Sequence, residues 1–254
     1  MKIGIGSYAY PWNVQHGFTA DQLLDEAILH KAQVLQICDN LDHSKIDWAT
    51  LLSRAKDNGI ELQVGHIGGP SLLVETAKIA GQIGSPIVRF VIGPQCVTQS
   101  THEIADDFRD AARICMENGA RLALENQDFF KTSQLAEIVS LIGHGCGVVL
   151  DTANSLSNLE GTECIVKNLG AYAICLHAKD VVVEREFHMY GFRVFGVPTG
   201  RGSVDFRYLH DNLPDLETII LEQWHPTANN QPPLANEKEG VGRGLDYLRG
   251  IWAS

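Results

Sequence analysis

Residues 100–125, STHEIADDFRDAARICMENGARLALE, contain one complete helix–strand unit. Ser100 and Glu103 fit a capping box, in which each side chain satisfies a free backbone donor of the other residue. Apolar residues then recur at helical spacing, at Ile104, Phe108, Ala111, Ala112 and Cys115. Gly119 is placed to end the helix in a left-handed conformation. The apolar run 122–124 that follows is typical of a strand covered on both faces.

The same unit recurs along the chain. Thr19 and Gln22 fit a second capping box, and Asn58-Gly59 is placed to end another helix just before a strand. Eight strands are predicted, at 3–7, 34–38, 61–66, 87–92, 121–125, 147–151, 172–177 and 218–222. Most of their starts lie roughly 25–35 residues apart, which is about one βα unit each.

These features predict a single (β/α)₈ barrel over residues 1–254. Such barrels typically use about 250 residues as one domain, and no linker composition divides this chain. A doubly wound open sheet is the main alternative, but the count of eight strands weighs against it. A glycine-rich phosphate fingerprint is also missing after the first strand. Segments 183–203 and 226–236 have loop-like composition.

The overall composition narrows the partners and the compartment. The net charge of −11 argues against binding to duplex nucleic acid, which needs clustered Lys and Arg. The six cysteines form no CxxC pair and no export signal is evident, so a cytoplasmic protein with reduced thiols is expected. No stretch approaches the ~18 apolar residues that a membrane span requires, so no membrane partner is expected. A homodimer is compatible with this type of barrel.

Four successive predicted strands end on residues of metal-ligand type: Glu125, Asp151, His177 and Glu222. In a barrel these strand ends converge on the carboxyl-terminal face. Three carboxylates and one imidazole suit Mn²⁺ best, and Mg²⁺, Co²⁺ or Zn²⁺ would also fit. A dication would relieve the repulsion among the carboxylates. Any one of these residues alone would be an ordinary polar residue entering a loop, but the four together predict a metal site.

The spacing and the motifs resemble the xylose isomerase-like TIM-barrel superfamily of sugar isomerases, epimerases and dehydratases, which also contains endonuclease IV. In its ketose epimerases, the residues matching Glu125 and Glu222 bind metal and exchange protons on opposite faces of the substrate. The resemblance therefore implies that these two glutamates are catalytic. A metal chelated by a ketone and its neighbouring hydroxyl would acidify the α-carbon proton and stabilise an enediolate. Isomerisation or epimerisation of a small keto-sugar or keto-sugar acid is the expected reaction.

Two departures from the superfamily patterns narrow the choice. Asn154 stands where endonuclease IV has a histidine, and no Asp-x-His pair follows His177, so cleavage of DNA at abasic sites is not expected. Val183 stands where the neutral-ketose epimerases carry an arginine, which weighs against simple epimerisation of a free ketose.

Two cations near the predicted site point to an acidic substrate. Lys179 follows His177 by two residues, and Arg89 lies in the fourth strand. Together they would suit a substrate carboxylate or phosphate. A solvated loop lysine and an ion pair at the barrel rim are the alternatives. Decarboxylation or dehydration of a 3-oxo sugar acid is therefore the second functional hypothesis. The segment 188–202 resembles a subgroup linked to bacterial sugar-acid breakdown, which includes 3-oxo-isoapionate decarboxylase.

The remaining candidate substrate contacts are His66, Asp39, Asn154 and His188. His66 ends the third predicted strand, where a purely structural histidine is the alternative, and Asp39 either contacts substrate hydroxyls or simply opens a loop. His188 belongs to the long connection after the seventh strand, a type of loop that often forms a lid. Tyr8, Tyr10 and Trp12 would wall the pocket or pack as core aromatics. A metal-free binding barrel without activity is the last alternative.

Overall fold

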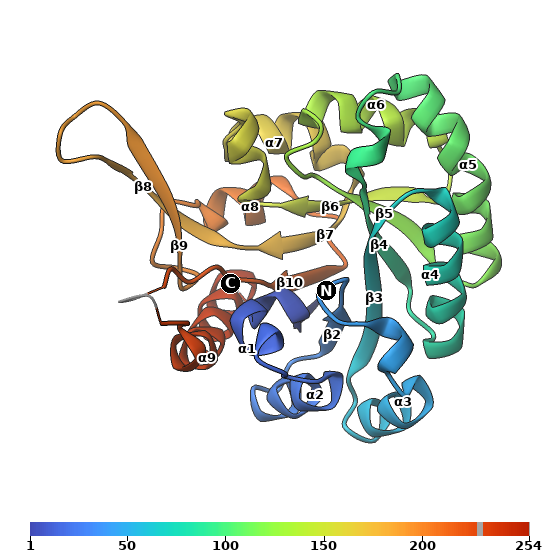
Figure 1. Cartoon of the computed structure of the whole chain (residues 1–254), viewed down its shortest axis with the longest axis horizontal. Helices are drawn as coiled ribbons and strands as arrows, with labels where there is room; N and C mark the ends of the chain where they lie inside the picture. The colour runs from blue at the N-terminus through green and yellow to red at the C-terminus, as the bar shows by residue number, and fades with distance from the viewer. Residues whose placement is uncertain (228–230, 254) are drawn as a thin grey trace.

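Eight parallel strands close into a barrel in the order β1-β10-β7-β6-β5-β4-β3-β2 (Figure 1). This computed structural model describes residues 1–227 and 231–253. The barrel strands are β1 (Lys2–Gly6), β2 (Val34–Ile37), β3 (Glu61–Gly68), β4 (Ile87–Ile92), β5 (Arg121–Glu125), β6 (Cys146–Asp151), β7 (Ala173–Ala178) and β10 (Thr218–Leu221). The predicted (β/α)₈ barrel is confirmed, and the open-sheet alternative is excluded by its closure.

Helices cover the outside of the barrel (Figure 1). They are α1 (Pro11–Gln15), α2 (Ala20–Leu29), α3 (Trp48–Asp57), α4 (Pro70–Ile83), α5 (Thr101–Glu117), α6 (Thr132–Ile142), α7 (Thr162–Leu169), α8 (Phe206–Asn212) and α9 (Leu234–Trp252). Short 3₁₀ turns occur at Ser7–Ala9, His43–Lys45, Pro94–Cys96, Asn154–Asn158 and Gly170–Tyr172. Both predicted capping boxes, at Thr19 and Ser100, are present. Gly59 and Gly119 take left-handed φ angles of +67° and +78° after their helices, as predicted.

The inside of the barrel is built in layers. A small apolar cluster of fully or almost fully buried side chains fills its middle: Val34, Ile87, Ala123, Val149, Cys175 and Ile220. Side chains on a strand alternate between its two faces, so the residue two positions further on also points into the barrel. Those next residues are Gln36, Arg89, Glu125, Asp151, His177 and Glu222. A polar layer therefore lies directly above the apolar one, at the carboxyl ends of the strands.

Close packing of β1 makes room for one member of this polar layer. A Cβ atom added at Gly6 would lie 2.9 Å from Glu222 Oε1 and 3.2 Å from its Cγ. Glycine at this position therefore lets β1 pass the buried Glu222 side chain without a clash.

The segment 183–203, predicted as a loop, contains an antiparallel hairpin instead. Strands β8 (Asp180–Arg185) and β9 (Phe192–Val197) pair and project away from the barrel (Figure 1). Glycine, proline and charged residues suggested a loop, but valine and phenylalanine supply the β-propensity that forms the two strands. The hairpin ends in strongly exposed aromatic residues, with Phe187 at 93% and Tyr190 at 91% exposure.

The other predicted loop, 226–236, falls partly outside the described residues, which omit 228–230. Within it, α9 begins at Leu234. Among the described residues, no helix has the length and apolar content needed to cross a membrane.

Candidate metal centre

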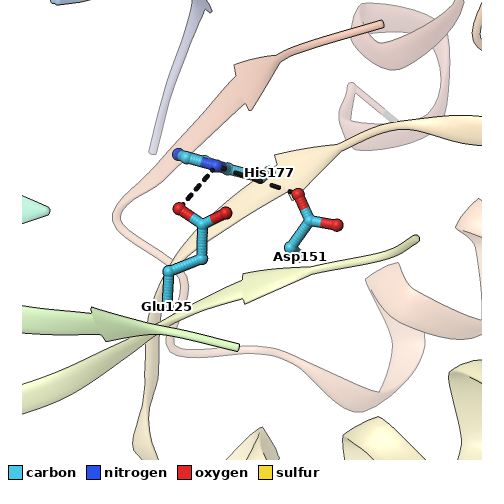
Figure 2. A group of neighbouring side chains, drawn as sticks. All are labelled: Glu125, Asp151 and His177. Carbon is cyan, nitrogen blue, oxygen red and sulfur yellow. Dashed lines mark ion pairs between the residues drawn. The ribbon is translucent and has the colours of Figure 1, made fainter. Parts of the chain in front are cut away.

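Three side chains from neighbouring strands meet at the carboxyl end of the barrel (Figure 2). Glu125 ends β5, Asp151 ends β6, and His177 lies near the end of β7. Each offers one ligand atom, and these atoms all lie within 4.8 Å of one another. His177 Nδ1 is 3.2 Å from Glu125 Oε2 and 3.9 Å from Asp151 Oδ2. The three side chains are almost completely buried, so they form a compact polar site inside the fold.

Glu222 reaches the same point from the residue after β10. Its Oε1 lies 3.3 Å from His177 Nδ1, and its side chain is fully buried. The structure thus brings together all four predicted metal ligands.

The spacing of these atoms fits a shared cation. Ligands about 2.1 Å from an ion lie roughly 3.0 Å apart in octahedral and 3.4 Å apart in tetrahedral geometry. The distances from His177 Nδ1 to Glu125 and Glu222, 3.2 and 3.3 Å, match that range, whereas Asp151 Oδ2, at 3.9 Å, would have to move closer to share the ion. Within the described residues, His177 Nδ1 and both oxygens of Glu222 are buried without a hydrogen bond, and of these three atoms only Glu222 Oε2 lies in an ion pair with a cation, that of Lys179. Buried polar atoms are rarely left without one, so a bound cation would satisfy them.

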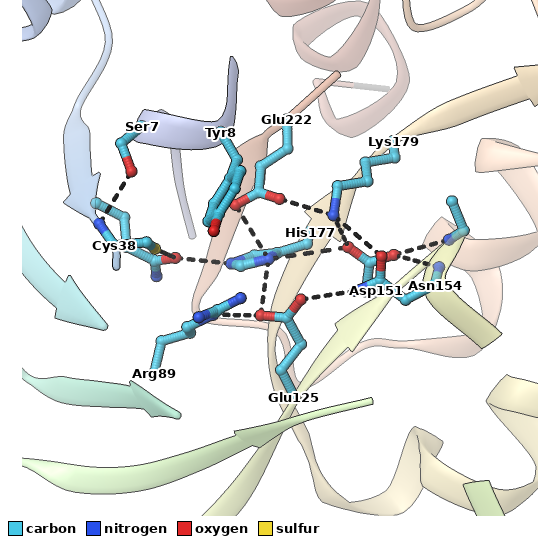
Figure 3. A network of polar contacts seen from close by, with 12 residues as sticks. Ser7, Tyr8, Cys38, Arg89, Glu125, Asp151, Asn154, His177, Lys179 and Glu222 are labelled. Atoms are coloured by element: carbon cyan, nitrogen blue, oxygen red, sulfur yellow. Dashed lines mark hydrogen bonds and ion pairs between the residues drawn. The ribbon is translucent and has the colours of Figure 1, made fainter. Parts of the chain in front are cut away.

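Lys179 lies within this carboxylate group (Figure 3). Its Nζ is 2.8 Å from Asp151 Oδ2, 2.9 Å from Glu222 Oε2 and 3.3 Å from Asn154 Oδ1. The contacts with Asp151 and Asn154 are hydrogen bonds, and the contact with Glu222 is an ion pair. Burial disfavours the charge, but Asp151 and Glu222 outweigh it, and the pKa of Lys179 lies above its ordinary value. Lys179 is therefore a charged partner of the cluster.

Arg89 is the second cation of the site, and it too is paired. Its Nε donates to Glu125 Oε2, and its Nη1 lies 2.9 Å from Asp39 Oδ1. Only 4% of Arg89 is exposed. Burial would raise the pKa of Glu125, but Arg89 and His177 hold that pKa below its ordinary value. Tyr8 completes this side of the network, because its hydroxyl donates to Asp39 at 2.8 Å.

The side chains of the cluster have an excess of negative charge that a dication would neutralise. Fully ionised, Asp39, Glu125, Asp151 and Glu222 would carry four negative charges, and Arg89 and Lys179 supply two positive ones. Two negative charges therefore remain if His177 is neutral. Burial raises the pKa of Asp151, and Glu125 and Glu222 raise it further although Lys179 opposes them. A divalent cation would neutralise the two remaining negative charges and offset the repulsion that opposes ionisation of Asp151.

A pocket of about 140 Å³ opens beside the cluster. Asn154 reaches it and donates to Glu125 Oε1 at 2.9 Å. The pocket is lined by Tyr8, Asp39, Ile67, Arg89, Val91, Glu125, Gln127, Asn154, Lys179 and Trp224. Four of the predicted substrate contacts, namely Asp39, Arg89, Asn154 and Lys179, therefore lie together at this opening.

The other two predicted contacts lie elsewhere. His66 lines a separate pocket of about 490 Å³, which shares Asp39 with the first one. His188 lies at the exposed end of the β8–β9 hairpin. Its ring stacks on that of Tyr190, with 6.1 Å between the ring centroids, and meets Phe187 edge-on, with 5.2 Å between the centroids. The hairpin projects away from the barrel, so the structure does not bring His188 to the cluster (Figure 1).

Sequence reasoning missed Gln36, which lies directly behind the site. Its Oε1 lies 2.7 Å from His177 Nε2, so His177 is held from the side opposite to the cluster. The strand alternation of β2 was the available signal, because a glutamine between apolar neighbours at 34–37 points into the barrel.

Solved structures that resemble the chain share its barrel. They include a D-psicose 3-epimerase from Clostridium cellulolyticum H10 crystallised with D-tagatose, at 15% identity and TM-score 0.70, with 99% of each chain covered. A probable 3-DHS dehydratase, AsbF, from Bacillus anthracis matches at 13% identity and TM-score 0.74, with 98% of each chain covered. An IOLI protein with a bound zinc atom matches at 15% identity and TM-score 0.73 over the whole of both chains. At these identities the likeness shows the fold.

No curated protein sequence matches the chain significantly. The family model described as "Xylose isomerase-like TIM barrel" matches residues 71–251. This match covers more than half of the chain and includes all four predicted metal ligands. The chain therefore belongs to the xylose isomerase-like TIM-barrel family.

Proposed function

We propose that this protein is a divalent-metal-dependent isomerase or epimerase that forms an enediolate from a small keto-sugar or keto-sugar acid. One observation carries the proposal: Glu125 and Glu222 approach His177 Nδ1 from two sides, at 3.2 and 3.3 Å, beside an open pocket (Figure 3). Two carboxylates so placed can take a proton from a substrate carbon and return it from another direction. The sugar epimerase among the similar structures supports this class of reaction.

Glu125, Asp151, His177 and Glu222 would hold the metal. When bound, a divalent ion would supply Lewis acidity for a carbonyl oxygen and its neighbouring hydroxyl. Three carboxylates and one imidazole form an oxygen-rich donor set, so we propose Mn²⁺ as the native ion. The zinc-containing neighbour supports a divalent ion at such a site.

The surroundings of the two glutamates suggest how protons are handled. Glu125 accepts hydrogen bonds from Arg89 and Asn154, and its lowered pKa keeps it in the ionised form that can accept a proton. Glu222 is paired with Lys179, whose ammonium lies 2.9 Å from Oε2 and can stabilise the glutamate after it has given up a proton. We therefore propose Glu125 as the base and Glu222 as the acid in one direction of the reaction, with the roles exchanged in the other.

Because Lys179 and Arg89 are both paired within the site, we favour isomerisation or epimerisation over decarboxylation or dehydration. Lys179 is hydrogen-bonded to Asp151 and Asn154 and ion-paired with Glu222, and Arg89 is bonded to Glu125 and Asp39. Both cations are neutralised by carboxylates of the site itself, so neither is an unpaired charge for a substrate carboxylate, which a decarboxylase of 3-oxo sugar acids would have to hold. This arrangement favours a neutral ketose, against the expectation of an acidic substrate drawn from Lys179, Arg89 and Val183.

The test is incubation of the Mn²⁺-loaded protein with ketoses, keto-sugar acids and ketose phosphates in D₂O, followed by proton NMR. We expect deuterium at the carbon next to the carbonyl and the appearance of an isomer or epimer. Release of CO₂ with an equivalent of keto-sugar would establish the decarboxylase instead. If no substrate exchanges a proton in the presence of Mn²⁺, Mg²⁺, Co²⁺ or Zn²⁺, the proposal is wrong.

A further inference from the structure

A line of polar side chains runs inside the barrel from its amino-terminal end to His177. His177 Nε2 lies 2.7 Å from Gln36 Oε1, and Gln36 Nε2 donates to Gln63 Oε1 at 3.0 Å. Gln63 Nε2 then donates to Glu61 Oε1 at 2.9 Å, and Glu61 Oε2 pairs with Lys2 at 2.5 Å. Both glutamines are fully buried. The line therefore connects the metal-binding cluster to an ion pair at the opposite end of β3.

The Glu61 carboxylate at the end of this line determines which way each glutamine amide is oriented. Glu61, paired with the Lys2 ammonium, can only accept hydrogen bonds. Gln63 must therefore turn its NH₂ group toward Glu61, which leaves its oxygen facing Gln36. Gln36 must in turn give its NH₂ group to Gln63 and present its oxygen to His177. An oxygen in that place requires a proton on His177 Nε2.

Cys38 supports the same direction independently. Its thiol lies 3.6 Å from Gln36 Oε1 and donates to it. Burial raises the pKa of the Cys38 thiol, so the sulfur keeps the proton that it donates. Two donors thus converge on Gln36 Oε1, and a reversed amide would place its NH₂ group against both of them.

We propose that Gln36 and Gln63 are positioning residues that hold the proton of neutral His177 on Nε2 and so keep the Nδ1 lone pair free for a metal ion. The consequence for metal binding rests on the proposed function. Nδ1 is the ring atom that lies among the carboxylates, 3.2 Å from Glu125 and 3.3 Å from Glu222. In the other tautomer, Nδ1 would carry a proton into the cation position, and two acceptors would face each other at Nε2.

Three substitutions separate this role from general stability. Gln36→Leu removes the acceptor of His177. Glu61→Gln replaces the obligatory acceptor at the far end by an amide that can also donate, so the direction of the line is no longer set. Its side chain is 20% exposed at the barrel end, which makes this the milder change. Lys2→Met is the matched control, because it breaks the same ion pair and leaves the Glu61 carboxylate in place.

The first readout is ¹⁵N NMR of the metal-free proteins at a pH well above the imidazole titration, with the His177 signals assigned from a His177→Gln variant. We expect the Nε2–H tautomer alone in the wild type and Lys2→Met, and a population of the Nδ1–H tautomer in Gln36→Leu and Glu61→Gln. A pure Nε2–H pattern in both of these variants would overturn the proposal.

The second readout is Mn²⁺ affinity by titration calorimetry. Loss of the partner that orients a ligating histidine typically costs about 10- to 100-fold, which is the fall expected for Gln36→Leu. Glu61→Gln should show a smaller fall, and Lys2→Met none. Equal losses in Glu61→Gln and Lys2→Met would overturn the proposal, since the ion pair rather than the acceptor would then be responsible. A wild type that shows the Nε2–H tautomer but binds no metal would contradict the proposed function and leave the tautomer assignment standing.

Discussion

At the scale of single residues, the proposed acid–base pair is the most direct target. Glu125→Gln and Glu222→Gln keep the size of the side chain but remove its ability to take a proton. Each should lower kcat by about 10²-fold or more, the usual cost of losing a general acid or base. Deuterium exchange into the substrate measures this effect, with metal content determined in parallel. Glu184→Gln on the exposed hairpin is the control. Near-wild-type turnover in either variant, with metal retained, would remove that glutamate from the mechanism.

His177 should make metal binding depend on pH. Burial of the ring opposes its protonation, but Glu125 and Glu222 together outweigh burial and raise the pKa of His177 above its ordinary value. A proton on Nδ1 competes with the metal. Mn²⁺ affinity should therefore be full at alkaline pH and be lost as pH falls through a value above about 6.5, the usual histidine pKa. Calorimetric titrations across this range test the prediction. His188→Gln should leave the profile unchanged, and a midpoint at or below the ordinary value would contradict it.

The four proposed ligands could be picked out from the sequence because each one comes directly after an apolar run, a relation that is local in the chain. The partners of these ligands could not be predicted in the same way. Arg89 pairs with Glu125 across two neighbouring strands, and the contact of His177 with Gln36 crosses the barrel interior from β7 to β2. Such contacts depend on strand register and barrel closure, which spacing along the chain does not specify. Lys179 was expected to meet substrate, and only the folded arrangement shows that it faces Asp151 and Glu222.

At the scale of elements, the β8–β9 hairpin should be separable from the stability of the barrel. Phe187 and Tyr190 are 93% and 91% exposed, so Phe187→Ser and Tyr190→Ser should change the free energy of unfolding by no more than about 0.5 kcal/mol. Phe90→Ala is the contrast, because Phe90 is fully buried against Phe108 and its loss should cost about 3–5 kcal/mol. Urea unfolding measures both. A large loss from the hairpin variants would mean that the aromatic end packs against another surface in solution, such as a second copy of the chain.

At the scale of the whole molecule, the metal site and the fold should be coupled. The cluster joins β5, β6, β7 and the end of β10, so a bound ion would tie together half of the barrel's strands. It would also neutralise two uncompensated negative charges in a buried place. The unfolded chain has no preformed site, so the ion should bind only the folded chain. It should then stabilise the fold by about 2.7 kcal/mol when the free metal concentration is a hundred times its dissociation constant.

This coupling is measured as a rise in the urea midpoint or Tm when Mn²⁺ is added to the metal-free protein, and as its reversal by a chelator. His177→Gln is the decisive comparison, since it removes the nitrogen ligand. The three carboxylate ligands, Asp39 and both cations stay in place. It should keep the cooperative unfolding of the barrel and lose most of the metal-dependent increment. An equal increment in wild type and His177→Gln would mean that the ion binds at some other acidic place on this chain of net charge −11. No increment with Mn²⁺, Co²⁺, Mg²⁺ or Zn²⁺ would instead favour a metal-free barrel, in which Lys179 and Arg89 are the permanent counter-charges of the cluster.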